Sequence, residues 1–465
     1  MELKFGTAGI RGIMGPEPGQ MNTETVQLAT LGVAGWLGGK GLVVISRDSR
    51  NNSLEFALET ARTLERCGIR ALMFEEIMPV PVLSFAVRYL HADAGVMITA
   101  SHNAKEYNGY KLYGATGGQV LPEDADVVQA EIRKVPEEAL QPAGDFTPEY
   151  VSEEVYQAYL EAMRSASEAV QAGSSGDPCA CGSEASEAPL RVIYTPLNGS
   201  GRRPVIETLT ADGYDLFVVP EQEEPDGNFT TTGQPNPEFP AVYRLALQYA
   251  EELQPDIIVA TDPDCDRVGS MVRTADGSYR LLSGNDQGAL VLSYLCETRD
   301  LSGKTFISSF VSTPLADRIA AAHEMVVEKT PVGFKFIAAG MDKAQEDFGF
   351  AFEESNGMIL GLYARDKDGV LGARLLCQAA DYYRQKGSSA AEALDKANAQ
   401  YGPVFSKTID VVVDPSLPKP ETKAYDYEDG SRVVVRPSGT EPKVKHYFFA
   451  PSEDRLAELR KEFGV

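Results

Sequence analysis

The strongest candidate for chemistry is the segment Asp262–Arg267, which carries aspartates at three alternate positions. In an extended loop, residues i, i+2 and i+4 point to the same side, so Asp262, Asp264 and Asp266 are predicted to converge. Three carboxylates repel one another unless a cation joins them, and an all-oxygen set suits a hard ion such as Mg²⁺. An acidic turn is the alternative. The apolar run 257–260 directly before it, typical of a buried strand, favours the metal site.

A second candidate is Ser101, which follows Ala94–Ala100, another predicted buried strand. A serine at a strand end, near Lys105 and Lys111, can act as a nucleophile or carry a phosphoryl group. Taken alone, a serine that caps a helix is an equally good interpretation. His102 is one of only four histidines, and a lone histidine is more often structural than catalytic. The local sequence therefore marks a candidate nucleophile without deciding its role.

A third candidate is the segment Arg436–Lys443, whose sequence is RPSGTEPK. A phosphate can be bound by a forked arginine (Arg436), two hydroxyls (Ser438 and Thr440) and a glycine whose N–H is approachable (Gly439). The alternative is a β-turn that contains an arginine by chance. Because the whole chain is acidic, this locally basic segment favours the phosphate site.

A fourth candidate is the acidic pair Glu353 and Glu354, followed by Ser355 and a glycine. Carboxylate and hydroxyl oxygens after an apolar residue can accept hydrogen bonds from sugar hydroxyls. A solvated loop is the more frequent interpretation of such a segment taken alone.

These motifs follow strands in a chain that alternates between predicted strands and helices. Such alternation is typical of α/β domains, whose active loops lie at the carboxyl ends of parallel strands. The predicted strands include 42–46, 190–196, 214–219, 407–413 and 443–449, and the predicted helices include 54–67, 203–210, 453–463 and a surface helix over 149–171. We expect α/β domains over residues 1–148, 190–300 and 301–402, a helix and flexible linker over 149–189, and an α+β domain over 403–465.

Composition excludes several classes of protein. The 465 residues carry a formal net charge of −25, which argues against nucleic acid or an anionic membrane surface as a partner. The apolar fraction of 43% provides large cores, and no apolar run reaches the 18 residues of a membrane helix. Six unevenly spaced cysteines make no disulfide framework, which favours a reducing compartment, and we expect a cytoplasmic protein. A phosphate site in such a chain needs its cations gathered locally.

Taken in order, the motifs resemble those of the α-D-phosphohexomutase superfamily over nearly the whole chain. GTAGIRG (residues 6–12) is similar to the family's N-terminal substrate loop, and Ser101 in TASHN matches the serine that carries the phosphoryl group. DPDCDR matches the metal loop, EESNG the sugar-binding loop and RPSGTEP the phosphate-binding loop. The segments KEYNGYKLYG, GFKFI and ARDKDGV look most like the phosphoglucomutase/phosphopentomutase branch. The resemblance implies three related α/β domains with mixed sheets and a smaller C-terminal α+β domain around a central cleft.

The resemblance also implies a reaction, the interconversion of glucose 1-phosphate and glucose 6-phosphate through a phosphoserine and a bound glucose 1,6-bisphosphate, with Mg²⁺ as cofactor. The implied partner is a small phosphosugar, with no nucleic acid or membrane, for a monomer or homodimer. Phosphopentomutase and phosphomannomutase are alternatives on the same fold, and a Mg²⁺-dependent phosphatase is a less favoured one. The implied catalytic residues are Ser101, Lys111, His102 and Arg11; the metal ligands Ser101, Asp262, Asp264 and Asp266; and the substrate-binding residues Arg267, Lys335, Glu353, Ser355, Arg436, Ser438, Gly439 and Thr440. As general acid/base, Lys111 is expected to have a lowered pKa.

The chain departs from the branch at a few positions. Asn198 stands where this branch often has histidine, and Asn356 replaces a common aromatic residue. The stretch 401–432 is short for the branch. None of the implied metal or phosphate residues is lost.

Overall fold

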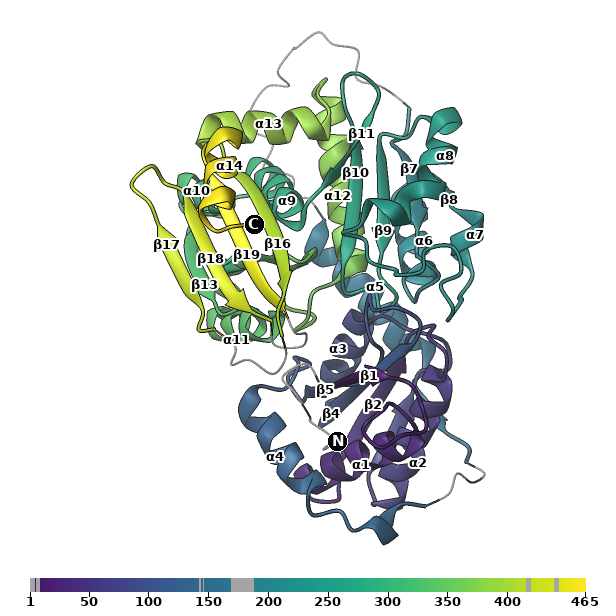
Figure 1. Cartoon of the computed structure of the whole chain (residues 1–465). Helices are drawn as coiled ribbons and strands as arrows, with labels where there is room; N and C mark the ends of the chain where they lie inside the picture. Colours follow the sequence, from purple (N-terminus) through teal and green to yellow (C-terminus); the bar gives the residue numbers. More distant parts are fainter. Residues whose placement is uncertain are drawn as a thin grey trace.

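The structure, a computed structural model, describes residues 5, 9–141, 144, 146–168, 188–414, 420–438 and 443–465. Four β-sheets follow one another along the chain. Figure 1 shows the first sheet and its helices at the bottom, the second sheet at the upper right, and the fourth sheet beside the third at the upper left. The first three sheets mix parallel and antiparallel strands and the fourth is antiparallel, which confirms the predicted fold class.

The first sheet holds the predicted nucleophile at the end of one of its central strands. Its strands lie in the order β1 (Ile10–Ile13), β5 (Tyr107–Gly114), β4 (Ala94–Ile98), β2 (Leu42–Arg47), β3 (Arg70–Met73) and β6 (Glu149–Tyr150). Strands β4, β2, β3 and β6 run parallel, and β5 is antiparallel to both its neighbours. One core is shared with α1 (Thr23–Trp36), α2 (Ser53–Arg66) and α4 (Pro122–Ile132), and the other face is covered by α3 (Val80–Tyr89).

The second and third sheets carry the acidic motifs at the ends of their strands. The second has the order β11 (Tyr279–Leu282), β10 (Val268–Arg273), β9 (Ile257–Thr261), β7 (Arg191–Thr195) and β8 (Asp215–Val218), with α6 (Arg202–Ala211), α7 (Pro220–Glu223) and α8 (Arg244–Leu253). The third has the order β13 (Val326–Thr330), β12 (Thr305–Ser309), β14 (Phe348–Glu353) and β15 (Gly357–Leu360), with α10 (Pro314–Ala322), α11 (Phe334–Ala344) and α13 (Ala390–Tyr401).

Two helices cross between these sheets. The boundary expected at residue 300 leaves α9 (Gly284–Thr298) with the second sheet, but this helix packs on β14 of the third. The contact is close because a Cβ at Gly288 would lie 2.4 Å from the ring of Phe352. Helix α12 (Gly369–Gln385) packs both on β15 of the third sheet and on β9 and β10 of the second. At its start, the Gly369 N–H donates to the carbonyl of Cys265 (3.0 Å), so α12 begins against the aspartate loop.

Helix α5 (Glu153–Ser167) is not the surface helix that its acidic sequence suggested. Its Val155, Tyr156, Tyr159 and Met163 are buried in the large core that spans three sheets, and the helix packs between α3 and α12. The polar residues of α5 occupy only its outer face. The helix is amphipathic, and the prediction wrongly treated the whole helix as exposed. Most of the predicted linker, residues 169–187, lies outside the described residues.

The fourth sheet is the small C-terminal unit, with the order β16 (Phe405–Val412), β19 (Lys443–Ala450), β18 (Arg432–Pro437) and β17 (Lys423–Asp426). Helix α14 (Glu453–Glu462) covers one face. On the other face, Val434, Tyr447 and Phe449 pack against Val311 from the third sheet's domain, so the fourth sheet is seated on the third. Within the described residues, no helix is both long and apolar enough to cross a membrane.

Candidate active site

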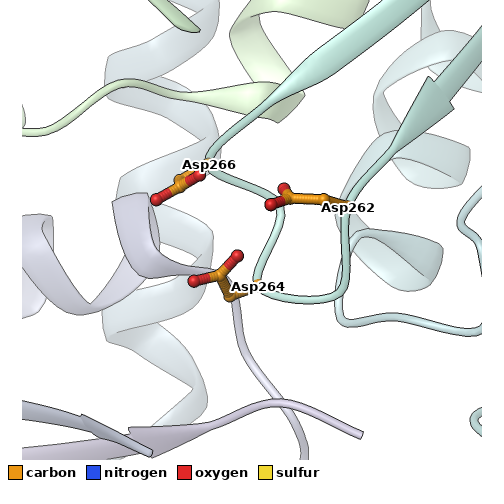
Figure 2. A group of neighbouring side chains, drawn as sticks. All are labelled: Asp262, Asp264 and Asp266. Carbon is orange, nitrogen blue, oxygen red and sulfur yellow. The ribbon is translucent and has the colours of Figure 1, made fainter. Parts of the chain in front are cut away.

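The three aspartates converge as predicted, but in a turn rather than in the extended loop from which their convergence was argued (Figure 2). Asp262, Asp264 and Asp266 lie in the loop between β9 and β10, are all buried, and offer oxygens within 4.8 Å of one another. Cys265 adopts a left-handed φ of 49° and turns its side chain into the hydrophobic core. The Arg267 N–H donates to Asp262 Oδ1 (3.0 Å) and closes the loop. This backbone turn places the three carboxylates around one point.

The free oxygens of this triad fit a divalent cation. Within the described residues, Asp264 Oδ1 and Asp266 Oδ1 are buried without a hydrogen-bond partner, whereas a lysine holds the other oxygen of each. Burial and the two neighbouring carboxylates raise the pKa of Asp262 well above its ordinary value, so the triad is electrostatically strained without a cation. Oxygen atoms alone are the ligands that Mg²⁺ prefers. The donor set therefore agrees with the predicted metal.

Ser101 reaches the triad from the first sheet. Its hydroxyl donates to Asp262 Oδ2 (2.8 Å), although the two residues are 161 positions apart in sequence. Its backbone has a φ of 52°, in the left-handed region, and its N–H donates to Thr99 Oγ1 (2.8 Å). A non-glycine residue in this conformation after a strand is held there by its surroundings. The fold thus presents the candidate nucleophile to the candidate metal ligands.

A buried ion pair, which the sequence analysis missed, holds the serine loop. Arg50 Nε lies 3.2 Å from Asp48 Oδ2, and both side chains are fully buried. The Arg50 guanidinium donates to four backbone carbonyls of the loop, those of Ser101, Asn103, Ala104 and Tyr107. Asp48 also accepts from Thr99 Oγ1 (2.6 Å), the same hydroxyl that accepts from the Ser101 N–H. The sequence predicts a strand over 42–46, and nothing local connects the residues after this strand to residue 101.

Replacing Arg50 with lysine is therefore expected to lower kcat about 100-fold while leaving KM for the substrate nearly unchanged. Lysine keeps the charge but cannot donate to four carbonyls in one plane, so Ser101 shifts relative to Asp262. Steady-state kinetics of the variant measure both constants. Arg62→Lys is the matched control, because Arg62 pairs with Glu59 on α2 and, within the described residues, none of its hydrogen bonds or ion pairs reaches the Ser101 loop. An unchanged kcat for Arg50→Lys would contradict the positioning role.

Lys111 occupies the site, but its predicted pKa shift was wrong. Its ammonium lies 2.6 Å from Asp264 Oδ2 and 3.1 Å from Asp266 Oδ2. Burial lowers the pKa of Lys111, but the two carboxylates outweigh burial and raise it above its ordinary value. The expectation assumed a cationic site, whereas the fold puts two carboxylates around the lysine. These carboxylates favour the protonated form of Lys111.

Lys367, in the segment ARDKDGV, is a second lysine at the triad and was not among the predicted site residues. Its ammonium lies 3.2 Å from Asp266, 3.6 Å from Glu353 and 3.5 Å from Asp366. Lys367 therefore contacts both the aspartate loop and the predicted sugar-binding loop. It can reach the aspartate loop because it lies just before α12, which begins directly against that loop. Lys111, Lys367 and Arg267 together hold the pKa of Asp266 below its ordinary value in spite of burial.

The remaining predicted catalytic groups lie beside the serine. His102 Nδ1 is 3.2 Å from Ser101 Oγ, and Arg11 donates to Asn103 Oδ1 (2.9 Å) within the same loop. Burial, and then the nearby Arg267 and Arg11, lower the pKa of His102 well below its ordinary value, so the imidazole is neutral. Arg267 is held by Glu238, with Nη1 3.1 Å from Oε1. Glu238 is thus a further residue that sequence reasoning missed.

The sugar loop follows β14. Glu353 is buried at the strand end, where it faces Lys367, and Ser355 is half-buried in the turn. Glu354 accepts from Ser309 Oγ (2.9 Å). Burial, and then Glu353, raise the pKa of Glu354, whereas Lys445 of β19 opposes them. The fourth sheet therefore lies close to this loop.

The predicted phosphate loop lies at the end of β18. Arg436 donates to Tyr447 Oη (3.5 Å), and the Ser438 N–H donates to the Lys443 carbonyl (2.8 Å) across the loop. Gly439 and Thr440 lie outside the described residues. Of the groups that the structure describes, Arg436 forms no hydrogen bond or ion pair with the aspartate triad. Lys335 is buried at the start of α11. Burial lowers its pKa, and the carboxylate of Glu123 from the first domain partly offsets this effect.

The two departures from the branch pattern lie at different places. Asn198 is buried and donates to the carbonyls of Glu221 (3.4 Å) and Glu224 (2.7 Å), so it holds a loop of the second domain. Asn356 is buried in the sugar loop with a left-handed φ of 65°. Asn356 is therefore the departure that lies in the site.

Comparison with known families matches four consecutive models. These are phosphoglucomutase/phosphomannomutase alpha/beta/alpha domain I over residues 2–139, domain II over 179–277, domain III over 283–401 and the C-terminal domain over 384–463. A phosphoglucomutase of Staphylococcus saprophyticus is 32% identical, and the alignment covers 99% of this chain and 92% of that protein.

Two solved structures share the fold. A phosphoglucomutase/phosphomannomutase family protein from Burkholderia thailandensis superposes with a TM-score of 0.75 at 19% identity, covering 99% of this chain and 95% of that one. N-acetylphosphoglucosamine mutase of Aspergillus fumigatus, in complex with GlcNAc-6P and magnesium, gives a TM-score of 0.59 at 16% identity, with coverage of 99% and 95%. At these identities the two structures are evidence for the fold alone.

Proposed function

This chain belongs to the phosphoglucomutase/phosphomannomutase family, and from that membership we propose that it interconverts α-D-glucose 1-phosphate and glucose 6-phosphate. It is a phosphosugar mutase, an isomerase that moves a phosphoryl group within its substrate. The observation that carries the proposal is the 2.8 Å hydrogen bond from Ser101 to Asp262, inside a buried triad in which two carboxylate oxygens have no hydrogen-bond partner among the described residues.

The proposed reaction has two transfers. In the first, the 6-hydroxyl oxygen of glucose 1-phosphate attacks the phosphorus of phosphorylated Ser101. The new O–P bond forms as the Ser101 Oγ–P bond breaks, which leaves glucose 1,6-bisphosphate. After the sugar turns round, Ser101 Oγ attacks the 1-phosphate and releases glucose 6-phosphate. The phosphorylated serine is regenerated, so the net change is an isomerisation.

The chain's own residues hold and orient these groups. Asp262, Asp264, Asp266 and the oxygens on Ser101 would hold Mg²⁺, which withdraws electron density from the transferring phosphoryl group when bound. Lys111 is the proposed general acid/base, and its raised pKa makes the donor form the resting one. Neutral His102 and Arg11 support the serine loop. In each transfer, Lys111 donates its proton to the departing oxygen and takes up the proton that the attacking hydroxyl releases, so no net proton is gained or lost.

The two orientations of the sugar require a symmetric set of contacts. Glu353 and Ser355 are proposed to bind hydroxyls that occupy similar places in either orientation. The non-transferring phosphate is assigned to Arg436, Ser438, Gly439, Thr440 and Lys335, with Arg267 between metal and substrate. The glycine at 402, with a φ of 91° directly after α13, supplies a flexible joint before the fourth domain.

A substrate panel tests this choice of sugar. Glucose 1-phosphate is expected to give the largest kcat/KM, ahead of mannose 1-phosphate and ribose 1-phosphate, when the three are assayed side by side with and without glucose 1,6-bisphosphate. A clear preference for the pentose or for mannose would move the assignment to phosphopentomutase or phosphomannomutase. Release of inorganic phosphate at a rate independent of the bisphosphate would identify a Mg²⁺-dependent phosphatase instead.

We also propose the cellular compartment and the binding partner of the enzyme. The four cysteines among the described residues, Cys67, Cys265, Cys296 and Cys377, are free thiols. Free thiols favour a reducing compartment, and we propose the cytoplasm. A small phosphosugar is the proposed partner, for a monomer or a homodimer.

A further inference from the structure

A second cavity lies in the third domain, away from every residue assigned above. It has a volume of about 340 Å³ and is lined by residues of α9, α12 and α13 and by His323 at the end of α10. Figure 1 shows these four helices in the upper part of the molecule. This volume is at the lower end of the range for small-molecule binding pockets. It is large enough for one hexose phosphate but too small for a dinucleotide. None of the predicted active-site residues lines it.

One of the residues that line this cavity, Ser293, has a buried hydroxyl that lacks a hydrogen-bond partner among the described residues. Ser293 is 7% exposed. A buried hydroxyl without a partner costs free energy, which a ligand that bonds to it would recover. The cavity is also lined by His323 and Tyr401, whose Nε2 and Oη atoms lie 3.1 Å apart. The imidazole and the phenol can both form hydrogen bonds with the hydroxyls of a ligand.

The charge at the rim favours an anion. Two lysines and one glutamate line the cavity. Both oxygens of Glu297 are already engaged, by Lys386 at 3.1 Å and by the hydroxyls of two tyrosines. Lys396 donates to Ser388 Oγ (3.0 Å) and interacts electrostatically with Glu392 on the same helix, but no ion pair within 4.0 Å is formed by Lys396 among the described residues. Its ammonium can therefore bind a ligand's negative group while Ser293 bonds to a hydroxyl of the same ligand.

From these observations we infer that this cavity is a second binding site, for a small anion that also carries hydroxyls, a sugar monophosphate being the fitting class. The phosphate contacts Lys396, and the sugar hydroxyls contact Ser293, Tyr401 and His323. Tyr401 ends α13, directly before the joint at Gly402, whose carbonyl accepts from Arg318 (2.9 Å). The site therefore adjoins the segment that carries the fourth domain, so occupancy restrains the end of α13.

Equilibrium dialysis of the full-length protein with labelled glucose 6-phosphate tests the inference. The wild type is expected to bind two equivalents per chain. Ala397→Phe, which fills the cavity, is expected to bind one. Lys396→Gln is expected to weaken that equivalent about tenfold or more, since a charge-assisted hydrogen bond is lost. Both variants should keep wild-type turnover, because neither residue contacts the active site.

Controls separate this site from the catalytic one. Lys343→Gln, an exposed lysine on α11, should leave both equivalents unchanged. Arg436→Gln should weaken the other equivalent, and its failure to do so would count against the proposed function but not against the cavity. Inorganic phosphate and glucose, tested separately, should each compete poorly, because each lacks one half of the contacts. A single equivalent in the wild type, or two equivalents in both cavity variants, would overturn the inference.

Discussion

Replacing Ser101 with alanine is expected to reduce mutase turnover about 10⁵-fold, the scale at which loss of a nucleophile removes covalent catalysis. The side chain is small and its loop is held through backbone carbonyls by Arg50, so the fold should survive the change. Coupled assay of glucose 6-phosphate formation measures the loss. Intact-mass measurement should in parallel show a wild-type fraction heavier by one phosphoryl group, absent from the variant.

The matched control is Ser270→Ala. Ser270 is also fully buried, on β10 just beyond the aspartate loop, and within the described residues its hydroxyl has no partner. Its loss should change neither turnover nor the phosphorylated fraction. If Ser101→Ala kept substantial mutase activity, or if the variant remained phosphorylated to the wild-type extent, the phosphoserine assignment would be wrong.

The second large effect is expected at the metal. Asp264→Asn should abolish tight Mg²⁺ binding and lower kcat about 1,000-fold, because it removes one unit of negative charge from the triad and replaces a carboxylate oxygen with an amide nitrogen that does not bind Mg²⁺. Asparagine has nearly the same shape, so packing is preserved. Calorimetric titration of Mg²⁺ into the chelator-treated protein measures one equivalent in the wild type and none in the variant.

Removal of the metal from the wild type should reproduce the kinetic loss reversibly. Chelator treatment is expected to stop turnover, and added Mg²⁺ should restore it, whereas Asp264→Asn should stay inactive after the same addition. Asp347→Asn, a 78% exposed carboxylate beyond α11, serves as the control and should retain both properties. Full activity of the chelated wild type would rule out the proposed metal role.

The aspartate triad shows how much local spacing can predict. Three alternating acids after an apolar strand predicted that the carboxylates converge, and they do. The cause differs from the extended loop that was assumed, because the Cys265 N–H donates to the Asp262 carbonyl and Cys265 has a left-handed φ, which makes a turn. The structure places these oxygens within 4.8 Å, as expected. Strand-end positions likewise predicted where Ser101 and Glu353 lie, since the motifs and the strands before them are contiguous in sequence.

Lys111 and Lys367 show where local reasoning fails. Neither the sign of the pKa shift of Lys111 nor the presence of Lys367 at Asp266 follows from neighbouring residues, because the aspartates that they contact lie more than 100 positions away, in a loop of another domain. The carbonyl oxygens that accept from Arg50 are likewise distant in sequence, more than 50 positions away. Electrostatic environment depends on distance in space, and that distance is set by packing.

The sequence by itself determined the four motifs, their order, the alternation of strands and helices, and the charge balance that made a locally basic phosphate loop stand out. Only the tertiary structure decided which motifs meet. Helices α9 and α12 pack closely against their neighbours because Gly288 and Gly369 have no side chain at the points of contact. This packing brings the third domain's loops against the second domain's aspartates. Local spacing fixes directions along a few residues, but the packing of whole helices and sheets fixes how separate loops share one site.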